Sequence, residues 1–151
     1  MLDHVHWMGK ALEEAQRAFE LGEVPVGAVV VHRDRIAGRG HNRTESSGQP
    51  FEHAEVVAMW DAVVNLRRKT LEDCILYSTV EPCVMCIGAV LLARVPRVIF
   101  GVREPKTGAC ESVFSIPNEP SLDNPVVVTG GVEEERAREL MQAFFRRQRS
   151  R

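Results

Sequence analysis

Apolar residues recur at two different spacings along the chain, and each spacing predicts a different kind of element. Between residues 5 and 19 they follow a helical period, which predicts an amphipathic helix that ends before Gly22. The apolar, β-branched run at 24–31 and the segment 36–42 predict two strands joined by a tight turn. The chain is therefore expected to open with a helix followed by a hairpin.

The remainder of the chain alternates between helical and extended patterns. Helices are expected at 52–66, 82–94 and 132–149, strands at 74–79, 97–102 and 126–129, and loops at 44–51 and 105–124, the second with one short helix. This order predicts an α/β protein, a three-layer α/β/α sandwich with a five-stranded mixed sheet. A chain of 151 residues fits one domain, so we expect residues 1–151 to fold as a unit.

Charge is unevenly distributed along the sequence. The net charge is −2, from 19 basic and 21 acidic residues, so the surface as a whole does not indicate a nucleic-acid-binding protein. The last eight residues, however, carry four arginines and no acid. This basic tail could contact a phosphate backbone locally, although a solvated helix end that complements the helix dipole would explain it equally well.

No targeting segment is recognisable in the sequence. The first residues lack the basic start and apolar run of a secretory signal, and the longest apolar stretch, 84–93, is too short to cross a bilayer. We therefore expect a cytoplasmic protein without membrane association. Four cysteines in such a protein are better candidates for metal ligands or buried thiols than for disulfides.

Two of these cysteines lie three positions apart, behind a proline at the start of a predicted helix. At this spacing Cys83 and Cys86 project from the same helix face and can reach one ion. A helix N-terminus also favours the thiolate that zinc requires. His53, at the start of another predicted helix, adds a nitrogen ligand. Three protein ligands are typical of a catalytic zinc site, where water takes the fourth position.

A structural zinc site would need a fourth protein ligand, and the candidates are distant in the sequence. Cys74 falls inside a predicted strand, Cys110 in a loop, and His41 at the end of a strand. We interpret Cys74 as a core thiol and Cys110 as a loop thiol without a role in metal binding. Recruitment of one of these residues is the structural alternative to a catalytic site.

Glu55 follows His53 by two positions, a spacing that does not share a helix face, so we do not expect it to be a ligand. At a helix start it could instead stand beside a metal-bound water, accept its proton and deliver that proton to a leaving amine. An acid in the first turn is also favoured by the helix dipole. Without the cysteines, the dipole would be sufficient explanation.

His-x-Glu followed by Pro-Cys-x-x-Cys is the signature of zinc-dependent nucleobase deaminases. Matching segments extend over most of the chain: 23–31, 40–43, 81–86, 97–101, 105–109 and 144–146. On these residues the chain resembles the cytidine deaminase superfamily and, within it, the bacterial tRNA-specific adenosine deaminases.

The resemblance implies one zinc ion per subunit on His53, Cys83 and Cys86, with Glu55 as proton shuttle. The implied reaction converts adenosine to inosine at the wobble position of a tRNA anticodon, by attack on C6 of adenine. The implied partners are the tRNA anticodon stem-loop and a second copy of the chain in a homodimer. Substrate contacts are expected from a polar residue, a pocket wall and RNA-facing side chains: Asn42, Pro25, Val26, Lys106, Phe145, Arg146 and Arg149.

Some positions depart from the family pattern. Glu52 and Glu111 stand where a small residue and a glycine are usual, and residues 112–124 diverge. None of these positions bears on the zinc chemistry, but all of them bear on RNA binding.

Two other functions are compatible with parts of the sequence. A deaminase of a free nucleobase or nucleoside, of the guanine or cytosine type, would share every metal residue. The acidic body of the chain favours such a small substrate, whereas the basic tail and Lys106 favour RNA. A non-catalytic, zinc-containing RNA-binding subunit would usually lack the shuttling carboxylate, and Glu55 is present.

Overall fold

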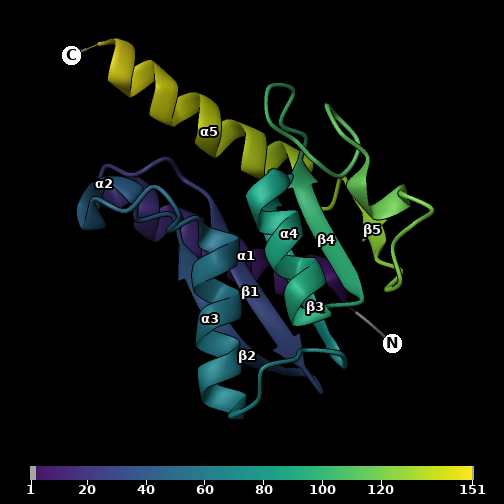
Figure 1. Cartoon of the computed structure of the whole chain (residues 1–151). Helices are drawn as coiled ribbons and strands as arrows, with labels where there is room; N and C mark the ends of the chain where they lie inside the picture. Colours follow the sequence, from purple (N-terminus) through teal and green to yellow (C-terminus); the bar gives the residue numbers. More distant parts are fainter. Residues whose placement is uncertain (1–2, 151) are drawn as a thin grey trace.

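The computed structural model describes residues 3–150 (Figure 1). Met1, Leu2 and Arg151 lie outside the described residues, and with them the first two positions of the expected N-terminal segment and the last arginine of the basic tail. The elements, in chain order, are α1 (His4–Glu20), β1 (Gly27–His32), β2 (Arg35–His41), α2 (Thr44–Ser47), α3 (Ala54–Leu66), β3 (Cys74–Val80), α4 (Val84–Ala93), β4 (Arg97–Val102), a 3-10 turn (Ile116–Asn118), β5 (Val127–Thr129) and α5 (Glu134–Arg149).

The five strands form one mixed sheet, as the sequence predicted. Its spatial order is β2-β1-β3-β4-β5. Strand β1 pairs antiparallel with both β2 and β3, whereas β3, β4 and β5 run parallel to one another. The parallel pairs are connected through α4 and through the long 103–126 connection. The predicted α/β architecture is therefore confirmed.

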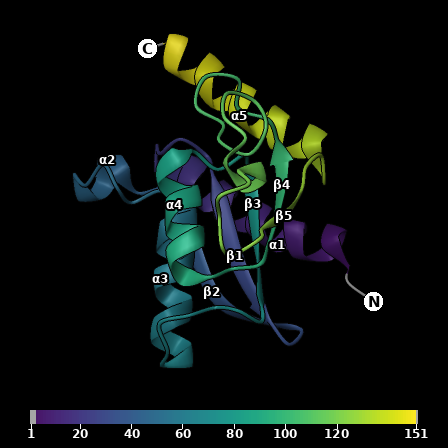
Figure 2. The ribbon, with the colours of Figure 1, turned by 45° about the vertical axis from the view of Figure 1, so that its right-hand side comes forward.

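Helices cover both faces of the sheet and make the three expected layers (Figure 2). Successive side chains of a strand point to opposite faces, so each strand contributes to two cores. In β1, Val29 and Val31 pack with residues of α1, while Ala28 and Val30 pack with residues of α3 and α4. Helix α5 lies on the α1 side and crosses one end of the sheet. Among residues 3–150, no helix is both long and apolar enough to cross a membrane.

Helix α3 packs unusually close to β2, because that strand carries glycine where the helix passes. A Cβ atom on Gly40 would lie 2.3 Å from the carbonyl oxygen of Ala54, a distance that no side chain can accept. The backbone of the first turn of α3 therefore rests directly on the end of β2. This contact places the residue that precedes the helix, His53, beside the sheet end.

The first predicted strand begins later than expected. Regular pairing starts at Gly27, and residues 24–26 form a tight turn in which the amide of Val26 donates to the carbonyl of Val24 at 2.8 Å. Pro25 at the centre of this turn has no amide proton to contribute to a ladder. An apolar, β-branched composition was therefore insufficient to extend the strand through this proline.

The segment expected as loop at 44–51 contains the short helix α2. The fully buried carboxylate of Glu23 accepts hydrogen bonds from the amide of Glu45, at 3.0 Å, and from the amide and hydroxyl of Ser46. These are amides of the first turn, which have no partner within a helix. A distant side chain thus stabilises a helix whose preceding residue, Arg43, makes no side-chain capping bond.

These contacts predict that stability depends on the ionisation of Glu23. Burial opposes ionisation, but the hydrogen bonds from Ser46 and the two amides outweigh it and hold the pKa of Glu23 below its usual range. A lowered pKa in the folded state stabilises the protein above the unfolded-state value of about 4.3, and this contribution is lost as the pH falls. We expect Glu23→Gln to lower the free energy of unfolding at pH 7 by about 1–3 kcal/mol.

Urea unfolding at fixed protein concentration checks this prediction. The difference between wild type and Glu23→Gln should shrink between pH 5 and pH 3 (roughly the range of carboxyl titration) because the wild-type carboxylate then also becomes neutral. Glu139→Gln, at an exposed position of α5, is the matched control and should change stability little at any pH. If the difference in stability between wild type and Glu23→Gln stays constant with pH, the stabilising role of the ionised Glu23 carboxylate is contradicted.

Candidate active site

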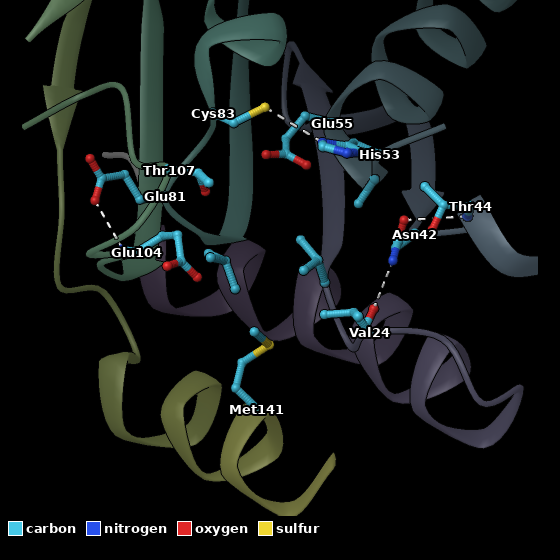
Figure 3. Close-up of a pocket in the computed structure, with 13 residues that line it drawn as sticks. Val24, Asn42, Thr44, His53, Glu55, Glu81, Cys83, Glu104, Thr107 and Met141 are labelled. Atoms are coloured by element: carbon cyan, nitrogen blue, oxygen red, sulfur yellow. Dashed lines mark hydrogen bonds between the residues drawn. The ribbon is translucent and has the colours of Figure 1, made fainter. Parts of the chain in front are cut away.

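A pocket of about 250 Å³ lies at the end of the sheet where β2 and β3 finish and β1 begins. The N-termini of α3 and α4 both point toward it, and α5 passes below it in the close-up view (Figure 3). Segments from six parts of the chain line it: Val24, Val26, Asn42, Thr44, His53, Ala54, Glu55, Val80, Glu81, Cys83, Glu104, Thr107 and Met141.

The two helix N-termini each begin with a candidate metal ligand. His53 is the residue that precedes α3, and Cys83 is the residue that precedes α4; both have extended backbones. This position usually carries Ser, Thr, Asp or Asn, whose oxygen accepts from the free amides of the first turn. Neither His53 nor Cys83 makes such a capping bond. Their side chains point toward one another instead (Figure 3).

His53, Cys83 and Cys86 bring three ligand atoms together in a compact triangle. Sγ of Cys83 lies 3.5 Å from Nδ1 of His53 and 3.7 Å from Sγ of Cys86, and the third side, from Cys86 Sγ to His53 Nδ1, is 3.6 Å. Such a group can hold a metal ion. Within residues 3–150 no other group of three His, Cys, Asp or Glu residues has this geometry.

The electrostatics of the triangle favour a thiolate. The hydrogen bond with Cys86, aided by His53, lowers the pKa of Cys83 to about 4, although burial opposes this. The same contact and burial raise the pKa of Cys86. The hydrogen bond with Cys83 also raises the pKa of His53, so the imidazolium and the thiolate stabilise each other. A bound cation would take the place of the protons that these groups now share.

Glu55 projects into the pocket from the first turn of α3. Its side chain is only 4% exposed, and burial raises its pKa to about 7. Figure 3 shows the carboxylate between His53 and Thr107, below the sulfur of Cys83, and it is not part of the triangle. A carboxyl group with a pKa close to neutrality can both accept and donate a proton under physiological conditions.

One wall of the pocket comes from the turn before β1 and from the end of β2. Val24 and Val26 line it, while Pro25 between them is buried and is not among the lining residues. Asn42 lines the same wall; its amide nitrogen donates to the carbonyl of Val24 at 3.4 Å, and its amide oxygen accepts from the amide of Thr44 at 3.4 Å. The structure thus places Val26 and Asn42 at the pocket, as the sequence led us to expect.

The opposite wall includes four residues that the sequence had not indicated. Glu81 directly follows β3, Glu104 and Thr107 lie in the loop after β4, and Met141 extends from α5 toward the pocket (Figure 3). Glu81 and Thr107 belong to matched family segments and could have been found there. Lys106, which was expected to contact substrate, is exposed and is not among the lining residues.

The remaining expected contacts lie on the outer surface of α5. Phe145, Arg146 and Arg149 are exposed and do not line the pocket. Their helix is fastened to α1 by Arg147, whose guanidinium lies 4.1 Å from the ring centre of Phe19 and donates to its carbonyl at 3.0 Å. The three side chains are therefore presented from a fixed helix.

The candidates for a fourth ligand lie outside the triangle. Cys74 begins β3, at the far end of the sheet, and packs beside Arg68 and Asp73. Cys110 is buried in the loop near Glu81 but does not belong to the ligand group. Among the described residues, the arrangement therefore has three protein ligands and a pocket on its open side.

The chain is similar to known deaminases in sequence and in fold. Residues 2–149 match the MafB19-like deaminases. The tRNA-specific adenosine deaminase of Aquifex aeolicus (strain VF5) is 43% identical over 145 residues, which cover 96% of this chain and 95% of that protein. A solved structure from a study of A-to-I editing by tRNA:A34 deaminases at the wobble position of transfer RNA has a TM-score of 0.86 and 37% identity, over 89% of this chain and 98% of that one.

A guanine deaminase from Bacillus subtilis is also similar, at 33% identity and a TM-score of 0.66, over 82% of this chain and 79% of that one. The fold is thus common to deaminases of RNA and of a free base. The match to the family of MafB19-like deaminases spans almost every residue of the chain. The Aquifex aeolicus relative is 43% identical over nearly the whole length. The chain belongs to the family of MafB19-like deaminases.

Proposed function

We propose that this deaminase converts adenosine to inosine at the wobble position of a tRNA anticodon, with zinc on His53, Cys83 and Cys86. The observation that carries the proposal is the open three-ligand group beside a buried carboxylate, in a pocket of one nucleobase's scale. Full-length relatives named as tRNA-specific adenosine deaminases support the choice of substrate.

The ligand triangle fits zinc in its dimensions. Tetrahedral zinc with Zn–S of about 2.3 Å and Zn–N of about 2.0 Å separates two sulfurs by about 3.8 Å and a sulfur from a nitrogen by about 3.5 Å. The corresponding distances here are 3.7 Å between the sulfurs and 3.5 and 3.6 Å from sulfur to nitrogen. The donor set, two sulfurs and one imidazole, is also one that zinc prefers.

The chemistry of the proposed reaction divides between the metal and Glu55. Zinc with three protein ligands supplies an activated water at neutral pH. Glu55 takes a proton from the attacking water and returns it to the exocyclic amino group of adenine. The C6–O bond forms, the C6–N bond breaks, and ammonia leaves. Burial suits Glu55 to both halves of this transfer, because it raises the pKa of the carboxyl to about 7.

The pocket walls support recognition of a single base. Val24 and Val26 offer apolar contact for a base, and Asn42 adds a polar group with both a donor and an acceptor. A pocket of about 250 Å³ cannot admit a stacked loop, so the target adenosine must turn out of its stack. We infer that Pro25 keeps the two valines in place by fixing the turn between them.

RNA contacts outside the pocket are assigned to exposed residues. We infer that Lys106, Phe145, Arg146 and Arg149 contact the anticodon stem-loop, because cations neutralise phosphates and an exposed aromatic ring can stack on a base. The proposed location is the cytoplasm. All four cysteines are free of disulfides, which is typical of proteins in a reducing compartment such as the cytoplasm.

We further infer that the protein forms a homodimer through the outer face of α3 and α4. Trp60 is 71% exposed and Leu92 is 85% exposed, and they line one shallow depression. Val64 and Phe51 extend this apolar surface. Large exposed apolar side chains that lie together are typical of a protein interface. The surface adjoins the pocket through α3, so a partner would border the RNA site.

Conversion of adenosine in an anticodon stem-loop tests the proposed function. The zinc-loaded protein should produce inosine only at the wobble position, and Glu55→Gln should lower kcat by a factor of about 10²–10⁴ while zinc stays bound. Inosine is detected by nucleoside mass spectrometry and zinc by elemental analysis.

Free guanine, cytosine, adenine and their nucleosides serve as comparison substrates in the same assay. Ammonia release from one of these without any inosine in full-length tRNA would replace the tRNA assignment with a free-base deaminase. Metal binding without turnover of any substrate, unaffected by Glu55→Gln, would indicate a non-catalytic subunit.

The dimer is tested by sedimentation velocity. We expect the wild type to sediment as a dimer. The double substitution Trp60→Ser/Leu92→Ser should raise the dissociation constant of the dimer about a hundredfold or more, because buried aromatic and aliphatic anchors dominate interfaces. Phe114→Ser, at an exposed aromatic residue of the 103–126 connection, is the matched control and should remain dimeric. A monomeric wild type, or a dimer that resists the double substitution, would contradict this surface.

A further inference from the structure

Glu81 is a buried carboxylate for which the proposed chemistry has no use. Its side chain is 2% exposed, and it precedes Pro82 and the ligand Cys83. Burying a carboxylate costs several kcal/mol unless hydrogen bonds replace its water. The partners of its oxygens therefore indicate what the residue does.

All of these partners belong to the loop that follows β4, which we call the 104–112 loop. Five donors reach the carboxylate: the amides of Glu104, Cys110, Glu111 and Ser112, at 3.1, 3.1, 2.9 and 3.0 Å, and the hydroxyl of Ser112. Four of the five are backbone groups. Glu81 therefore constrains the course of the loop and not merely one side chain; Figure 3 shows its bond with Glu104.

The loop is shaped to receive this carboxylate. A Cβ atom on Gly108 would lie 2.4 Å from Oε1 of Glu81, so only glycine leaves room for the side chain. The loop also contacts the ligand segment directly, because the amide of Ala109 donates to the carbonyl of Pro82 at 2.9 Å and Gly108 pairs with Cys83 as an isolated bridge. The loop is thus held at two places, at the carboxylate of Glu81 and at the segment that carries Cys83.

The loop in turn supplies part of the pocket wall. Glu104 and Thr107 line the pocket, and Lys106 lies between them on the surface. Without Glu81, four amides would lose their partner, and a nine-residue segment with little regular structure would be free to move. We propose that Glu81 is a positioning residue that holds the 104–112 loop in its substrate-binding form before the substrate arrives.

The kinetic consequence rests on the proposed function. A wall that contacts substrate equally in the ground state and the transition state contributes to KM more than to kcat. Loss of Glu81 should therefore raise KM for the anticodon stem-loop, with kcat nearly unchanged. The change of charge alone would lower KM, because removal of a negative charge favours RNA binding.

The structural consequence can be measured without any substrate. In the zinc-loaded protein, Glu81→Gln replaces one accepting oxygen with the amide NH2 group of glutamine, a donor that faces other N–H donors. Hydrogen exchange at the amides of Cys110, Glu111 and Ser112 should become about tenfold faster or more, while α3 and the sheet keep their protection. Ser112→Ala removes one donor of the five and should give a smaller change at the same amides; it also serves if Glu81→Gln does not fold. Glu139→Gln controls for loss of one surface charge.

The same variants are then assayed with the anticodon stem-loop. We expect KM to rise about tenfold in Glu81→Gln, with kcat within about threefold of wild type and an unchanged zinc content. Unchanged exchange in the loop would overturn the proposal. So would loss of zinc together with kcat, because Glu81 would then support the ligands and not the loop. A wild type inactive on RNA would contradict the proposed function, whereas the exchange data would still decide the role of Glu81.

Discussion

The structure depends on the convergence of two helix N-termini on one point at the end of the sheet. The ligand atoms of His53, Cys83 and Cys86 come from segments that are thirty residues apart, yet they lie within 3.7 Å of one another. Close packing of α3 on β2 at Gly40 fixes one helix, and the parallel β3–α4–β4 unit fixes the other. The absent capping bonds leave both end residues free to face a shared ion.

Three buried glutamates around this point show how environment assigns different roles to one side chain. Glu23 and Glu81 are surrounded by donors, mostly backbone amides, and each holds a segment that lines the pocket. For Glu55 burial is the dominant influence and raises the pKa to about 7. Ionised carboxylates thus maintain the walls, while the one with a perturbed pKa is available for proton transfer.

The sequence predicted the fold, and it singled out the three residues that come together as a possible metal site, because both depend on local periodicity and spacing. All the principal helices and strands are present, and the Cys83–Cys86 spacing does bring two sulfurs to one point. Helix α2, the late start of β1 and the pocket positions of Glu104 and Met141 could not be read in this way. They depend on tertiary contacts, such as Glu23 with Ser46, that no local pattern encodes.

X-ray absorption at the zinc edge tests most directly whether the site is an open, catalytic one. The account predicts one zinc per chain, with two sulfurs at about 2.3 Å and two nitrogen or oxygen ligands at about 2.0 Å, one of them from exchangeable solvent. Addition of a purine ligand should perturb the light-atom shell and leave the sulfurs in place. A first shell with three sulfurs, insensitive to added ligand, would contradict the account, because Cys110 would then close the site and leave no position for the reacting water.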